Sequence, residues 1–173
     1  MSEARRITIP AGLIVLIGPP GAGKSTFAAA LAKLEGVEVV ASDDIAEELF
    51  GRDYSSSRDP QIFKERDGRV LEHLDAGRTV VADSTNVTAN ARLRLLELAR
   101  LTGAAATAVR FDVDLETLRA RVADRGKEIG GFDVLYASFA RSCALEALRS
   151  EGFVEVLEAP TTPTDYALRP SSS

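Results

Sequence analysis

The residues with the most distinctive chemistry lie in a glycine-rich stretch that follows an apolar run and precedes a helical pattern. The stretch matches the pattern G-x-x-x-x-G-K-[ST] between Gly18 and Ser25. Glycines let the backbone curl so that successive N–H groups point at anionic oxygens, and the positive end of the following helix strengthens that field. This pattern predicts a phosphate-binding loop made by Gly18, Gly21, Ala22, Gly23, Lys24, Ser25 and Thr26.

Two side chains of this loop have specific roles in nucleotide chemistry. We expect Lys24 to bridge the β- and γ-phosphates of a nucleotide and the Ser25 hydroxyl to ligate Mg²⁺. A glycine-rich turn that merely precedes Lys-Ser is the alternative. The strand and helix patterns on either side of the loop argue against that alternative.

Two aspartates that follow predicted strands are the candidate functional carboxylates. The run 13–17 is apolar throughout, as expected for a strand buried on both faces of a parallel sheet. Asp43 follows the next strand pattern and Asp83 follows the third. Because ligands collect beyond the carboxyl ends of such strands, we expect both aspartates near the loop. A carboxylate in this position is otherwise often a helix cap or a turn residue.

Strand patterns alternate with helical patterns along the chain, which indicates an α/β fold with a mostly parallel sheet. We expect strands at residues 13–17, 37–41, 79–82, 104–111 and 153–157, and helices at residues 24–34, 44–50, 60–76, 88–101, 115–123 and 132–148. One domain covers residues 13–169, after a lead-in, residues 1–12, with an extra edge strand at 6–9. The end of the chain is rich in Pro, Thr and Ser, and we expect it to be loosely held, with a tail at 170–173.

Composition narrows the class of protein. The chain has 173 residues, 45% of them hydrophobic, with one cysteine and a formal net charge of −5. No apolar run approaches membrane-spanning length, and the first residues lack a signal-peptide core. We therefore expect a cytoplasmic protein with no membrane partner. The acidic balance argues against a general nucleic-acid coat protein.

The residues that follow Asp83 favour phosphoryl transfer over hydrolysis. The GTPase motif N-K-x-D is absent, and Asp83 is followed by Ser84-Thr85-Asn86 rather than by a water-activating glutamate. Transfer to an acceptor needs a base near the acceptor hydroxyl, and Asp43 fits that role.

The sequence also predicts a lid, a segment whose cations would contact the phosphoryl group during its transfer. Residues 124–131 form a polar, glycine-bearing segment that contains Arg125, and Arg121 lies one helical turn earlier. Two arginines at this spacing share one helix face and can converge on an anion. A solvated basic face is the alternative.

The segment around the third strand resembles a known family. The run Val80-Val81-Ala82-Asp83-Ser84-Thr85-Asn86-Val87, with Arg92 downstream, is similar to the D-x-T-N…R signature of polynucleotide 5′-kinases. The glycine loop, Ser42-Asp43, Arg121-x-x-x-Arg125 and Glu151-Gly152-Phe153 occur in the same order and at similar spacing. Over nearly the whole chain the sequence resembles the kinase domain of bacterial polynucleotide kinase–phosphatases that repair RNA.

The resemblance implies a P-loop NTPase fold of the adenylate-kinase type, with strand order 2-3-1-4-5, helices on both faces and a short arginine-bearing lid. It implies an ATP-dependent kinase that uses Mg²⁺ and phosphorylates a polynucleotide 5′-hydroxyl. In this interpretation Asp43 is the general base, and Lys24, Arg121 and Arg125 contact phosphates. Ser25 and Asp83 lie at the metal, and Asp83 also lies near the acceptor.

The acceptor side departs from the family pattern. Three residues after the catalytic aspartate the family usually has arginine, but this chain has Ala46, followed by Glu47 and Glu48. Acidic side chains repel the phosphates of a polynucleotide. Two alternatives therefore stay open, a small-molecule kinase and a nucleotide-binding module that does not catalyse. The Ser-rich end resembles a linker, so the chain is also a candidate for one part of a longer multidomain protein.

Overall fold

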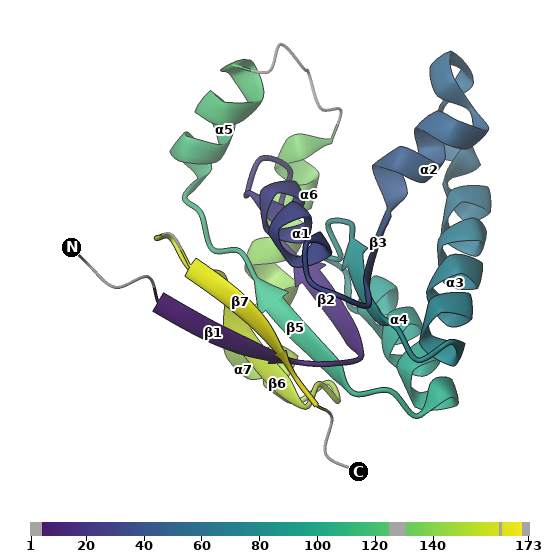
Figure 1. Ribbon diagram of the computed structural model, residues 1–173. Coiled ribbons are helices and arrows are strands. Elements are labelled where there is room, and N and C mark those ends of the chain that lie inside the picture. The colour runs from purple at the N-terminus through teal and green to yellow at the C-terminus, as the bar shows by residue number, and fades with distance from the viewer. Residues whose placement is uncertain (1–4, 125–130, 163, 171–173) are drawn as a thin grey trace.

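The computed structural model describes residues 5–124, 131–162 and 164–170, and a five-stranded parallel sheet forms its centre (Figure 1). The strand order is β3-β4-β2-β5-β6, and every neighbouring pair is parallel. Numbered along the chain within this sheet, that order is 2-3-1-4-5, so the expected topology is confirmed. The strands are β2 (Leu13–Ile17), β3 (Val37–Ala41), β4 (Thr79–Asp83), β5 (Ala106–Arg110) and β6 (Glu155–Glu158).

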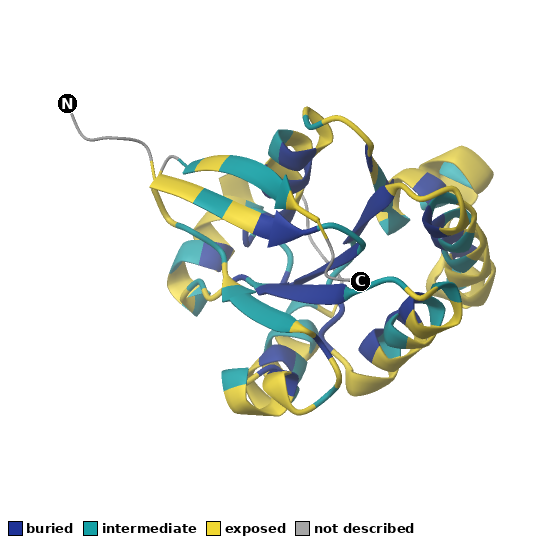
Figure 2. Ribbon diagram, turned by 60° about the horizontal axis from the view of Figure 1, so that its bottom comes forward, coloured by how far each residue is buried: buried dark blue, intermediate teal, exposed yellow. Residues whose placement is uncertain are grey.

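Helices cover both faces of this sheet, as expected, and turn their exposed sides outward (Figure 2). Helices α1 and α5 pack on one face, and α2, α3, α4 and α7 pack on the other, while α6 contributes side chains to both cores. Within the described ranges, no helix combines the length and the apolar character that a membrane span requires. The helices are α1 (Lys24–Ala32), α2 (Ser42–Leu49), α3 (Asp59–Asp75), α4 (Ala89–Thr102), α5 (Leu115–Asp124), α6 (Phe132–Ser142) and α7 (Leu145–Arg149), with short 3₁₀ turns at Gly51–Asp53 and Ser56–Arg58.

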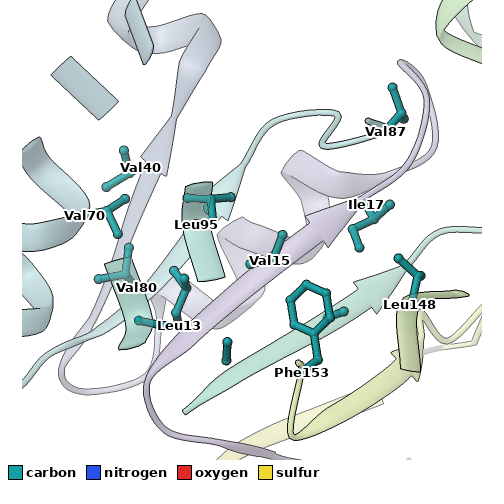
Figure 3. Packing of buried hydrophobic residues seen from close by; sticks show 14 of the residues in the cluster. Leu13, Val15, Ile17, Val40, Val70, Val80, Val87, Leu95, Leu148 and Phe153 are labelled. Carbon is teal, nitrogen blue, oxygen red and sulfur yellow. The ribbon is translucent and has the colours of Figure 1, made fainter. Parts of the chain in front are cut away.

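Strand β2 is the most buried element of the sheet, because none of its five residues is exposed to solvent. Leu13, Val15 and Ile17 point into the core beneath α3, α4, α6 and α7 (Figure 3). Ile14 and Leu16 point into the opposite core beneath α1 and α5. Burial of one such side chain contributes about 1.5–3 kcal/mol. The strand is therefore held from both sides up to the point where the phosphate-binding loop begins.

The lead-in contains a strand, which belongs to a second, smaller sheet. Residues 5–10 form β1 (Arg5–Pro10), which pairs in parallel with β7 (Thr164–Arg169) in a separate two-stranded sheet (Figure 1). The strand expected at 6–9 is therefore present, but it does not extend an edge of the five-stranded sheet. The expectation of a loosely held C-terminal region fails at β7, because Tyr166 packs against Phe27 of α1 with ring centroids 5.0 Å apart. Alternating inward apolar residues in both strands explain this pairing, since both cover the same core.

The long helix expected at 132–148 is broken between α6 and α7, at Cys143 and Ala144. Two arginine side chains donate hydrogen bonds to the backbone carbonyl groups at the break. Arg92 Nη2 donates to the oxygen of Ser142 at 2.9 Å, and Arg110 Nε donates to the oxygen of Cys143 at 2.6 Å. Side-chain donors that satisfy the last carbonyls remove the need for a further helical turn. Cys143 is buried, as expected, at the end of α6.

We predict that the β1–β7 pair contributes to the stability of the domain through Ile9, which is 1% exposed and lies in the core beneath α1. Replacing Ile9→Ala should lower the free energy of unfolding by about 2–5 kcal/mol, because buried methyl groups are lost and a cavity remains. Leu101→Ala is the matched control, since this side chain is 66% exposed. Urea denaturation measures both variants, and equal effects would contradict the prediction.

Candidate active site

The phosphate-binding loop runs from Gly18 to Gly23, between the end of β2 and the start of α1. A Cβ atom at Gly18 would lie 2.9 Å from the Cβ of Phe111, so only glycine fits there. Gly23 has a φ of 98°, a left-handed value that other residues adopt at a cost. The two fixed glycines of the sequence pattern are therefore required by a close approach and by a backbone turn. The loop lies at the carboxyl edge of the sheet, as expected.

Lys24 lies over this loop rather than in solvent. Its side chain is buried, and Nζ donates hydrogen bonds to the carbonyl oxygens of Gly18 and Pro19, each at 2.8 Å. A buried ammonium group needs such partners, because desolvation of an unpaired charge is costly. Phosphate oxygens are stronger partners than carbonyl groups, since bonds between two ionised groups are about twice as strong. The loop therefore holds a cation where a phosphate chain is expected to lie.

Ser25 and Asp83 lie side by side at the loop, although they are far apart in the sequence. Ser25 Oγ donates to Asp83 Oδ2 at 3.1 Å. Strand β4, which Asp83 ends, is the immediate neighbour of β2, and this adjacency brings the pair together. A hydroxyl and a carboxylate are the hard oxygen ligands that Mg²⁺ prefers. The two side chains therefore fit the metal role that the sequence predicts for them.

The Asp83 carboxyl lies in an environment that disfavours its charged form. Burial is the largest cause and raises its pKa above the ordinary value of 3.8. The Ser25 hydrogen bond and the charge of Lys24 act in the opposite direction, whereas the charges of Asp43 and Asp44 raise the pKa further. The negative charge of Asp83 is thus only partly compensated by the chain's own groups, which favours a bound cation at this position.

Asp43 lies in the first turn of α2, because this helix begins at Ser42, two residues before the expected start. Its side chain is exposed, and its negative charge raises the pKa of Asp83. The hydroxyls of Ser42 and Ser84 are hydrogen-bonded to each other, which joins the start of α2 to the end of β4. The structure thus brings Asp43 to the same edge as the phosphate-binding loop, with its carboxylate open to solvent.

The predicted lid is described in part. Arg121 of α5 reaches the loop, where its Nη1 donates to the carbonyl oxygen of Gly21 at 3.1 Å. Gly21 lies directly beneath α5, since a Cβ there would be 3.4 Å from Cγ2 of Val122. Arg125 lies outside the described residues. Arg121 is therefore placed beside the expected phosphates, and its proposed role stays a prediction.

Sequence reasoning assigned no role to the backbone of residues 84–87, and the structure places this segment against the loop. Gly18 N donates to the carbonyl oxygen of Thr85 at 3.0 Å, and Asn86 Nδ2 donates to that of Leu16 at 2.8 Å. Asn86 is buried and has a φ of 49°, which asparagine tolerates better than most residues. The D-x-T-N signature was the sequence signal for this segment, but its contacts are tertiary.

A family model described as "AAA domain" matches residues 13–147 of the chain. The chain belongs to this family. The match begins with β2 and includes the phosphate-binding loop, Asp43, Asp83 and Arg121.

The chain is also similar to curated shikimate kinases. It is 39% identical over 71 residues to that of Actinobacillus pleuropneumoniae serotype 5b (strain L20), and 41% identical over 71 residues to that of Legionella pneumophila (strain Corby). Each match covers 39% of this chain and 41% of the relative. The chain thus spans about two fifths of the length of these relatives.

Solved structures share the fold. The structure titled "Structure of the Pnkp1/Rnl/Hen1 RNA repair complex" contains a chain that is 26% identical, with a TM-score of 0.67. That likeness covers 77% of this chain and 45% of the other. A putative kinase from Chloroflexus aurantiacus is 22% identical with a TM-score of 0.63, and the likeness covers 90% of this chain and 87% of the kinase. The expected P-loop NTPase fold is confirmed.

We predict that Asp83→Asn stabilises the nucleotide-free protein at pH 7. The pKa of Asp83 is raised in the fold, so the folded state binds more protons than the unfolded state between pH 3.8 and that raised value. Stability therefore falls as the pH rises through this window, and the loss persists above it. Asparagine removes this loss. Urea denaturation from pH 4 to pH 7 measures the effect, and a variant less stable than the parent at pH 7 would contradict it.

Proposed function

We propose that the chain is an ATP-dependent phosphotransferase that moves the γ-phosphoryl group of ATP to an acceptor hydroxyl. The observation that carries this proposal is the meeting of four groups at one edge of the sheet. Lys24 lies over the phosphate-binding loop, and Ser25 is hydrogen-bonded to Asp83. Asp43 lies in the first turn of the helix that follows β3, the strand next to β4. Membership of the AAA domain family and the similarity to kinases support it.

ATP is expected to bind with its phosphates in the loop, where Lys24 exchanges its carbonyl partners for phosphate oxygens. Ser25 and Asp83 would hold Mg²⁺, which would neutralise negative charge on the phosphates. The backbone N–H groups of the loop are expected to donate hydrogen bonds to the phosphates as well. Arg121, which the structure places at the loop carbonyl of Gly21, is expected to contact the phosphoryl group as it moves.

The transfer step follows from the placement of Asp43. The acceptor hydroxyl gives its proton to the Asp43 carboxylate, and its oxygen forms a bond to the γ-phosphorus. The bond from the γ-phosphorus to the bridging oxygen breaks, and ADP leaves with that electron pair. An exposed carboxylate at the same edge of the sheet as the loop suits this role, because an acceptor can reach it from solvent.

A polynucleotide 5′-hydroxyl is the first acceptor to test, and a small-molecule hydroxyl is the second. The family signature and the similarity to a chain of an RNA repair complex support the first. The surface of α2 supports the second. Ala46 packs against the core, Glu47 is exposed, and exposed Glu48 is paired with Arg69 at 2.6 Å, so these side chains offer no cation to a polynucleotide phosphate.

The deciding experiment incubates the protein with γ-labelled ATP, Mg²⁺ and either 5′-hydroxyl RNA and DNA oligonucleotides or pooled small alcohols that include shikimate. The proposal expects label on one of these acceptors. Label on oligonucleotides alone assigns the polynucleotide reaction, and label on a small alcohol alone assigns the second. ATP binding without transfer to any acceptor would overturn the proposal in favour of a nucleotide-binding module that does not catalyse.

We predict that Asp43→Asn reduces kcat by about 100-fold or more and leaves ATP affinity nearly unchanged, because asparagine keeps the shape of the side chain but cannot accept the proton. Asp75→Asn is the matched control. This exposed carboxylate ends α3, shortly before the start of β4, whereas the phosphate-binding loop lies near the other end of that strand. Steady-state transfer assays and calorimetric ATP titration provide the two readouts. Transfer by Asp43→Asn at the parental rate would leave the proposed mechanism without its base.

We predict that Arg121→Ala reduces kcat more than ATP affinity, since a cation that meets developing charge acts mainly on the transition state. Loss of one such donor costs about 10²–10³ in rate. Arg119→Ala is the control on the same helix, because exposed Arg119 is paired with Asp133 at 3.1 Å rather than with the loop. If the two variants have the same turnover, Arg121 belongs to a solvated basic face instead.

A further inference from the structure

Arg92 is the most completely engaged charged side chain near the active site, and none of the roles above uses it. It projects from α4 and is 0% exposed. All five of its N–H groups have an acceptor, which is the full capacity of a guanidinium group. The acceptors are both carboxylate oxygens of Glu151, the carbonyl oxygens of Asn86 and Ser142, and the sulfur of Cys143.

These acceptors belong to three separate parts of the chain. Asn86 follows β4, Ser142 and Cys143 end α6, and Glu151 lies between α7 and β6. Arg92 holds Glu151 by two bonds, Nε to Oε2 at 2.8 Å and Nη2 to Oε1 at 2.7 Å. Such a two-pronged pair fixes orientation as well as distance. Arg92 and Glu151 therefore form a rigid joint between the end of α6, the entry to β6 and the segment after β4.

The segment after β4 connects this joint to the metal position. Two hydrogen bonds join residues 83–87 to the phosphate-binding loop and the start of α1. Ser25 donates to Asp83, and Gly18 donates to Thr85. Two further hydrogen bonds join this segment to α4 and α6. Arg92 Nη1 donates to the carbonyl oxygen of Asn86 at 3.0 Å, and the Ser142 hydroxyl donates to the carbonyl oxygen of Val87. These two bonds hold the segment at a residue, Asn86, whose left-handed φ asparagine tolerates better than most residues.

We propose that Arg92, paired with Glu151, is a positioning residue that holds residues 83–87 against the phosphate-binding loop and thereby keeps the Asp83 carboxylate at Ser25. This inference rests on the nucleotide and Mg²⁺ roles proposed above. Arg92 contacts neither expected ligand and acts through Asn86 and the segment that follows Asp83. Groups that orient a metal ligand in this way typically change metal affinity or activity by about 10- to 100-fold when they are altered.

The test compares Arg92→Lys with Arg110→Lys. Lysine keeps the charge but has three donors, so at least two acceptors of Arg92 lose their bond. Arg110 is the matched control because it also anchors the end of α6, by donating to the oxygen of Cys143, and pairs with Glu158. The described contacts of Arg110 do not include residues 83–87. Glu151→Gln is a second variant that removes the charge of the partner and retains its shape.

Two measurements report on the segment without requiring phosphoryl transfer. The first is the Mg²⁺ concentration that half-saturates the binding of fluorescent mant-ATP. The second is amide hydrogen exchange across residues 84–88 in the nucleotide-free protein. We expect Arg92→Lys and Glu151→Gln to raise the Mg²⁺ midpoint about tenfold or more and to speed exchange across this segment, with mant-ATP binding in EDTA unchanged. We expect Arg110→Lys to change neither quantity.

An unchanged Mg²⁺ midpoint together with unchanged exchange in Arg92→Lys and Glu151→Gln would overturn the inference and leave Arg92 as an anchor of α6 and β6 alone. Equal changes in Arg110→Lys would overturn it as well, because they would report a general loss of stability. Failure of the proposed function is seen separately, as absence of phosphoryl transfer by the parent protein. If the parent binds no mant-ATP, hydrogen exchange alone decides the inference.

Discussion

The complete burial of strand β2 is the constraint on which the rest of the structure depends. A strand covered on both faces cannot shift without exposing apolar surface, and each residue contributes about 1.5–3 kcal/mol to holding it in place. The phosphate-binding loop begins directly after this strand, and α1 follows directly after the loop. A loop that must present backbone N–H groups to phosphates is thus fixed at both ends before any ligand arrives, which reduces the cost of ordering it on binding.

The edge of the sheet at this loop concentrates charge that the chain compensates only in part. Lys24 is satisfied by loop carbonyls, whereas burial disfavours the charge on Asp83 and the nearby Asp43 and Asp44 add to that effect. Such a site costs stability in the free protein, and under the proposed function a bound cation and phosphates would offset that cost. Residues placed for a reaction commonly oppose stability in this way.

Helix α2 and the 3₁₀ turns after it, where the proposed function expects the acceptor, differ in burial from the strands that lead to the loop. Strands β2 and β4 are almost wholly buried. In α2 and the 3₁₀ turns, most residues are exposed. Exposed side chains can change without unfolding the sheet. The two acceptors considered under the proposed function therefore differ in what they require of α2, not in what they require of the sheet.

The sequence by itself determined the local features: the apolar run of β2, the glycine loop, the alternation of strands and helices, and the aspartates after β3 and β4. These follow from residue type and periodicity over short distances, so composition and spacing reveal them. The strand order was available from the family signature rather than from periodicity, because side-chain patterns do not state which strands are neighbours.

Only the tertiary structure decided which distant residues meet. The pairing of β1 with β7 joins the two ends of the described chain, and neither strand is long or apolar enough to indicate its partner. The break between α6 and α7 depends on Arg92 and Arg110, which reach it from other elements, so helical periodicity alone predicted one continuous helix. Arg92 was visible as a residue of a signature, but its role depends on five acceptors spread over about 65 positions of the sequence. Hydrogen bonds over such distances form only when packing has already brought the segments together.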